Sequence, residues 1–91
     1  MSVSRAKLYS FLRSVGLYEA TEREGVVTIR FSSMDLEGAI GGVAEIVITG
    51  LVKGERVEVA RVVIVKNGAS EDVAPEVLGG WLNYIERYEH A

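Results

Sequence analysis

Apolar residues near the start of the chain recur at the spacing of one helix face. The set is Leu8, Phe11, Leu12 and Val15, at positions i, i+3, i+4 and i+7. A hydroxyl oxygen of Ser2 or Ser4 can cap the N-terminus of a helix here, and Gly16 stands where a left-handed C-terminal residue is expected. The pattern therefore predicts an N-terminal helix that buries this face.

Alternating apolar and polar positions on both sides of Glu24-Gly25 predict a hairpin, with strands over 17–23 and 26–31. Gly25 can supply the positive φ that a tight turn requires. One register matches side chains across the hairpin, and it pairs Arg23–Val26, Thr21–Thr28, Glu19–Arg30, Ala20–Ile29 and Tyr18–Phe31. We expect this register, because a slip of one residue would lose every one of these pairs.

The segment from Val43 to Val65 carries apolar residues on both faces, unlike a strand pair with one solvated side. We predict a second hairpin that turns near Lys53-Gly54 and places Ile48 opposite Val59. In that register the core face holds Ala44, Ile46, Ile48, Val57, Val59, Val63 and Val65, interrupted by Arg61. The other face mixes Val43, Val47, Leu51, Ala60, Val62 and Ile64 with Glu45, Thr49, Arg56 and Glu58. Such a mixture is typical of association surfaces.

The C-terminal part of the chain predicts a second helix. After the turn signal Asn67-Gly68, either Ser70 or Asp72 can cap a helix that holds Pro75 in its first turn. The wide apolar face of this helix consists of Val77, Leu78, Trp81, Leu82, Tyr84, Ile85 and Tyr88. Gly79-Gly80 lowers the helix propensity inside it, so the helix can also begin only after that pair.

The glycine-rich Ser32–Gly42 loop joins the two hairpins. We expect a loop or one or two helical turns there, because Ser32 and Asp35 have the spacing of a capping box. The predicted fold is α+β: a four-stranded, mainly antiparallel sheet with the N- and C-terminal helices packed on one face, in one domain over residues 1–91. If residues 33–40 formed a real helix, the order would become αββαββα, and the connection between hairpins could cross over.

Composition removes several kinds of chemistry. The chain has no cysteine, and its one histidine is His90 beside the C-terminus, so we expect no metal site and no cofactor. A net charge of −3 provides no general attraction to nucleic acid. No apolar run reaches the roughly 18 residues of a membrane span, and the first residues do not resemble a signal peptide, so we expect a cytoplasmic protein. Glutamine is absent and arginine outnumbers lysine seven to three, which is a tendency of hyperthermophile proteins.

These patterns describe how the chain is built and contain no motif that identifies a reaction. The main hypothesis is a non-catalytic protein-interaction domain, of the adaptor or chaperone-like kind, that acts as a homodimer. Unexplained apolar surface supports it, and the residues expected at the interface are Val47, Leu51, Val62, Ile64, Trp81 and Tyr84.

The sequence also allows two alternative functions. The first is a small-ligand-binding or enzymatic domain with its site at the Ser32–Gly42 loop, where the polar groups are Ser32, Ser33, Asp35, Glu37 and Glu45. A hard cation such as Mg²⁺ could use these oxygens, but the pattern favours a solvated loop with a helix cap, because no further ligand pattern accompanies them. The second is nucleic-acid binding through Arg5, Lys7 and Arg13 of the first helix, which the absence of a clustered basic patch disfavours.

Overall fold

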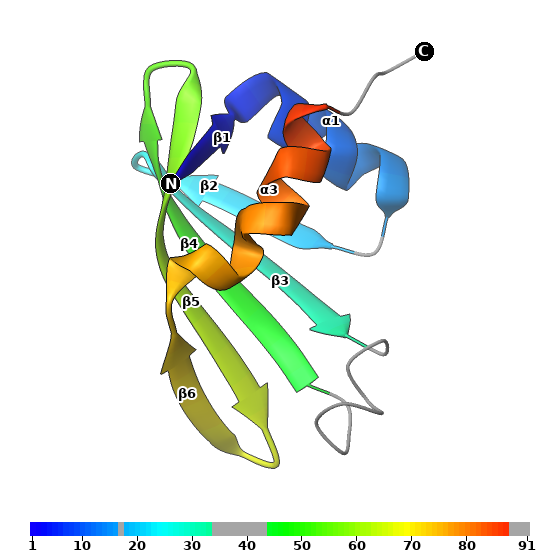
Figure 1. Cartoon of the computed structure of the whole chain (residues 1–91), viewed down its shortest axis with the longest axis vertical. Coiled ribbons are helices and arrows are strands. Elements are labelled where there is room, and N and C mark those ends of the chain that lie inside the picture. The colour runs from blue at the N-terminus through cyan, green and yellow to red at the C-terminus, as the bar shows by residue number, and fades with distance from the viewer. Residues whose placement is uncertain (17, 34–43, 88–91) are drawn as a thin grey trace.

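The structure is a computed structural model of the chain, and it describes residues 1–16, 18–33 and 44–87. In chain order, the elements are β1 (Ser2–Ser4), α1 (Arg5–Val15), β2 (Glu19–Arg23), β3 (Val26–Ser33), β4 (Ala44–Lys53), β5 (Arg56–Lys66), β6 (Ala69–Val73), the 3₁₀-helix η1 (Pro75–Leu78) and α3 (Gly79–Glu86). Figure 1 shows α3 crossing in front of a single twisted sheet, with α1 above β2 at the upper right of the view. The predicted α+β class with an antiparallel sheet and two helices is confirmed.

Within the described residues, the sheet has six strands and not the four that the sequence predicted. The order is β1-β5-β4-β3-β2, and every pairing is antiparallel. β1 pairs with the start of β5, and β6 pairs with the end of the same strand. The two additional strands carry no clear alternation, because β1 has three residues and β6 is almost wholly exposed. Asn67 and Gly68, with φ of 51° and 78°, form the tight turn that leads into β6.

The α1 helix has the two caps that the sequence predicts. The Ser4 hydroxyl accepts a hydrogen bond from the Lys7 amide at 3.3 Å, and Gly16, with φ of 70°, donates its amide to the Leu12 carbonyl at 3.3 Å. Three residues of the predicted apolar face are buried: Leu8, Phe11 and Leu12. Val15 is 36% exposed, because it lies in the last turn of the helix.

The first hairpin has the predicted register. The pairs are Glu19–Arg30, Ala20–Ile29, Thr21–Thr28 and Arg23–Val26. Glu24 and Gly25 form the turn with φ of 52° and 78°, as expected for a two-residue connection between twisted strands. The rings of Tyr18 and Phe31 meet edge-to-face with 4.8 Å between their centroids.

The second hairpin differs from the prediction in its turn and in its register. The pair Lys53–Arg56 flanks the turn, so the turn consists of Gly54 and Glu55. The register then shifts between Thr49 and Gly50, and Ala60 is the extra residue of a β-bulge. Each of these changes moves residues of β5 relative to β4.

The bulge reverses the faces that we expected for the second half of β5. Val62 lies opposite Ile48 and is buried in the core, and Ile64 packs against the core. Val63 and Val65 occupy the opposite face. The prediction that Val62 and Ile64 face outward while Val63 and Val65 form the core is therefore wrong.

The C-terminal helix begins later than its apolar pattern. Ser70 and Asp72 lie in β6 and cap no helix, which corrects the predicted N-terminus. Pro75 opens η1, and α3 follows from Gly79. Pro75 fits there because the first helical turn needs no amide hydrogen from it.

One buried cluster joins the helices to one face of the sheet. It contains Val3, Leu8, Phe11, Leu12, Val27, Ile29, Ile46, Ile48, Val57, Val59, Val62, Leu78, Leu82 and Ile85. Side chains of α1 and α3 thus pack on the same set of alternating strand residues. Among the residues that the structure describes, none on the other face of the sheet belongs to this cluster.

Candidate functional site

We call the face of the sheet opposite this core the open face. Its apolar side chains include two cross-strand pairs, Val26–Leu51 and Val47–Val63. Val65 lies on the same face, two residues beyond Val63 in β5. Val26 is 37% exposed and Leu51 is 38% exposed, whereas the other three are half-buried by their neighbours in the sheet. The open face therefore presents a discontinuous apolar strip across β3, β4 and β5.

Ion pairs lie beside this strip. Arg61 donates two hydrogen bonds to Asp72, at 2.6 and 3.0 Å, and so connects β5 to β6. A second pair joins Arg30 to Glu45 at 3.3 Å, and a third joins Lys53 to Glu58 at 3.3 Å. All of these side chains are well exposed, so each pair contributes little stability, and the pairs mainly give the strip a polar rim.

The predicted interface residues are divided between different surroundings. Val47 and Leu51 lie on the open face, as expected. Val62 and Ile64 belong to the core side, and Trp81 packs against the same core. Tyr84 is 58% exposed on α3. The six residues do not form one surface.

The residues of the predicted ligand loop are only partly described. Ser32 and Ser33 are the last residues of β3, and Glu45 lies opposite Ser32 in β4. Glu45 is engaged with Arg30 on the open face. Asp35 and Glu37 fall outside the described residues, so this ligand site stays a prediction.

Five aromatic rings meet at one end of the core. Phe11, Tyr18, Phe31, Trp81 and Tyr84 contribute them, and the centroid distances between contacting rings run from 4.8 to 6.1 Å. Most contacts are edge-to-face or tilted, the geometries that aromatic pairs favour. The indole Nε1 of Trp81 is buried and has no hydrogen-bond partner among the described residues.

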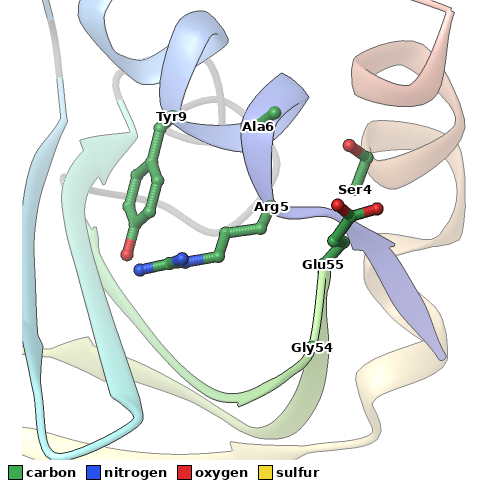
Figure 2. Close-up of a pocket in the computed structure, with 6 residues that line it drawn as sticks. All are labelled: Ser4, Arg5, Ala6, Tyr9, Gly54 and Glu55. Carbon is green, nitrogen blue, oxygen red and sulfur yellow. The ribbon is translucent and has the colours of Figure 1, made fainter.

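An open groove of about 370 Å³ lies where the start of α1 meets the turn between β4 and β5. Its lining is Ser4, Arg5, Ala6, Tyr9, Gly54 and Glu55, and Figure 2 shows the Arg5 and Tyr9 side chains converging in it. The Arg5 amide donates to the Glu55 carbonyl at 2.9 Å, which holds the helix start against the turn. The Arg5 guanidinium carbon lies 5.6 Å from the centroid of the Tyr9 ring.

Glu22 of β2 completes this cluster. Its carboxylate accepts hydrogen bonds from Arg5 at 2.8 and 2.9 Å and from the Tyr9 hydroxyl. Hydrogen bonds from Tyr9 and Arg5 lower the pKa of Glu22, and burial together with the bond to Glu22 raises the pKa of Tyr9. At neutral pH, Glu22 is thus ionised and Tyr9 is protonated. The cluster fastens α1 to β2.

A second network joins the two ends of the chain. The Glu86 carboxylate accepts from the Ser4 amide at 2.8 Å and from Arg56 at 2.6 Å. Lys7 also donates to the Glu86 carbonyl. Burial opposes ionisation of Glu86, but the hydrogen bonds from Arg56 and Ser4 outweigh it and lower its pKa. This network positions α3 against β1 and the start of α1.

Other kinds of site have no support in the described part of the chain. Residues 1–16, 18–33 and 44–87 contain no group of three His, Cys, Asp or Glu side chains that could hold a metal ion. None of the helices described there is long and apolar enough to cross a membrane. Comparisons with protein families, with curated proteins and with solved structures find no match to this chain.

Sequence reasoning missed Val63 and Val65 as open-face residues, because a continuous apolar run does not reveal which residues face inward. It also missed the salt-bridged cluster around Glu22. One sequence feature does predict β6: the Asn67-Gly68 pair after β5 favours a tight turn and a returning strand.

Proposed function

We propose that the protein is a non-catalytic protein-interaction domain that works as a homodimer and binds another protein through its open face. The observation that carries the proposal is the apolar strip of Val26, Leu51, Val47, Val63 and Val65 on that face. In this proposal α1 and α3 cover one face of the sheet and leave the other for a partner.

The composition of the open face supports binding of a protein. Protein interfaces combine an apolar centre with a polar rim, and this strip has such a rim in its exposed ion pairs. Half-buried valines lie flat on the sheet and lose little conformational freedom when a partner covers them. A partner that covers them would gain about 25 cal/mol of binding free energy for each Å² of apolar area buried.

The chemistry of the described polar groups fits a binding role better than a catalytic one. A hydrogen bond from Arg61 lowers the pKa of Asp72, and hydrogen bonds from Tyr9 and Arg5 lower the pKa of Glu22, so both move away from neutrality. A general acid or base works best with a pKa near the working pH. Of the three basic residues proposed for nucleic acid, Arg5 and Lys7 are already engaged within the protein.

The test places a photo-crosslinking amino acid at Val63 of the open face and, as a control, at Val77. Val77 is 63% exposed on η1, so it samples a surface outside the sheet. The proposal expects Val63 to capture a discrete protein that Val77 does not capture in cells of the source organism. Binding of that purified protein should then be lost in Val63→Asp and kept in Val77→Asp. Equal capture at the two positions, or binding that Val63→Asp leaves unchanged, would overturn the proposal.

A further inference from the structure

The β2 strand is an exposed edge of the sheet. It is the last strand on its side in the described part of the chain, and it pairs only with β3. All five of its residues, Glu19–Arg23, are exposed, and the Glu22 side chain bonds to Arg5 and Tyr9 of α1. Edge strands carry unpaired backbone groups and can pair with another strand.

The outward backbone groups of β2 can be identified from one hydrogen bond. The Val52 amide donates to the Gly25 carbonyl at 2.8 Å, so Gly25 bonds across to β4. By the alternation of an antiparallel ladder, every second residue of β3 also bonds to β4, and the residues between them bond to β2. Thr21 therefore bonds toward β3, whereas the backbone groups of Ala20 and Glu22 point toward the free edge.

We propose that β2 pairs with β2 of a second copy of this chain, antiparallel about a two-fold axis at Thr21. Ala20 then lies opposite Glu22 of the second copy, and each such pair would exchange both backbone hydrogen bonds. Thr21 meets its own counterpart at the axis, in a non-hydrogen-bonded position where side chains come close. The two six-stranded sheets become one continuous sheet.

The charges of β2 match this register. Glu19 lies opposite Arg23 of the second copy, and the two-fold axis repeats the pair. Moving the axis to Glu22 would bring two identical carboxylates together, and moving it to Ala20 would remove both ion pairs. At the opposite side of the sheet, which β1 and β6 form, an axis at the centre of β6 would set Glu71 against Glu71.

The open face continues across this contact. Thr49, Thr28 and Thr21 lie opposite one another on adjacent strands, and the axis extends their row into the second copy. A two-fold axis perpendicular to the sheet places both open faces on the same side. The inference rests on the homodimer of the proposed function, and it assigns self-association to β2 while leaving both open faces free for another protein.

The test uses two charge-reversal variants, Arg23→Glu and Glu19→Arg, with molar mass measured by light scattering over a hundredfold concentration range. Either variant alone opposes like charges twice across the axis, so its dimer should dissociate at least about tenfold more readily. Mixed in equal amounts, the two variants again place opposite charges at both contacts between positions 19 and 23, and the dimer should return. Val63→Asp, on the open face, is the control and should leave the dimer intact.

Restoration in the mixture supports the β2 contact, and misfolding of a variant cannot produce it. A wild-type dimer that neither reversal weakens would overturn the β2 inference but retain the homodimer. If Val63→Asp dissociated that dimer, the open face would be the self-association surface. A wild-type protein that stays monomeric over the whole range would overturn both the inference and the homodimer.

Discussion

The β-bulge in β5 predicts a large difference between two adjacent valines. Val62 is 1% exposed and faces Ile48 across the sheet, whereas Val63 is half-buried on the open face. In the register expected from the sequence, the two residues would exchange places. Truncating each to alanine therefore measures the register in solution.

The magnitudes follow from burial. Val62→Ala removes two buried carbon atoms, at about 0.8 kcal/mol each, and leaves a cavity that adds to the cost, for a total of about 2–3 kcal/mol. Val63→Ala loses less buried surface and mainly strand propensity, so it should cost about 1 kcal/mol or less. For a chain of this size, 2–3 kcal/mol corresponds to a decrease in melting temperature of roughly 10–20 °C.

The assay is urea denaturation followed by far-ultraviolet circular dichroism, with wild type and both variants at one low concentration. Equal slopes in the three transitions would show that the difference lies in the free energy of unfolding. Equal losses for the two variants, or a larger loss for Val63→Ala, would refute the bulged register and the assignment of Val63 to the open face.

Further outcomes concern glycine and pH. Gly50→Ala should destabilise the protein strongly, because a Cβ there would lie 2.5 Å from Val57 Cγ1. Gly80→Ala places its Cβ in open space on a helix, so it should raise the free energy of unfolding by up to about 1 kcal/mol. Thermal melts of both variants check these two outcomes. Glu22 and Glu86 have lowered pKa values in the folded state. The stability that they contribute is therefore present above the usual carboxyl pKa, and it is lost as the pH falls through the folded-state pKa. Unfolding free energies between pH 7 and pH 3 should therefore fall less steeply in Glu86→Gln than in wild type, and identical slopes would contradict the role of Glu86.

Local signals predicted the elements with complete sequence signatures. Helix α1 has a serine N-cap, a four-residue apolar face and a glycine C-cap, and these interactions lie within one short segment. The first hairpin was predicted in register because a two-residue turn with Gly25 and several matched pairs allow only one alignment. In both cases the deciding contacts join residues close together in the sequence.

The second hairpin shows where local reasoning ends. From Val62 to Val65 every residue is apolar, so either alternation fits, and a bulge of one residue decides between them. At the bulge, Gly50 comes too close to Val57 for any side chain to fit, a contact between two strands that the sequence does not display. The interface residues predicted from this hairpin were divided between core and open face for that reason.

Local patterns along the chain are enough to predict the α+β class, the first helix with its caps and the first hairpin with its register. They also indicate more apolar residues than one core would bury. The folded chain is needed to show that β1 and β6 extend the sheet, that Val63 and Val65 face outward, and that Arg5 and Tyr9 converge on Glu22. The physical reason is the range of the interactions. Caps and tight turns are set within a few residues, whereas edge strands, bulges and salt-bridged clusters depend on side chains and backbone from distant segments that meet only when the chain has folded.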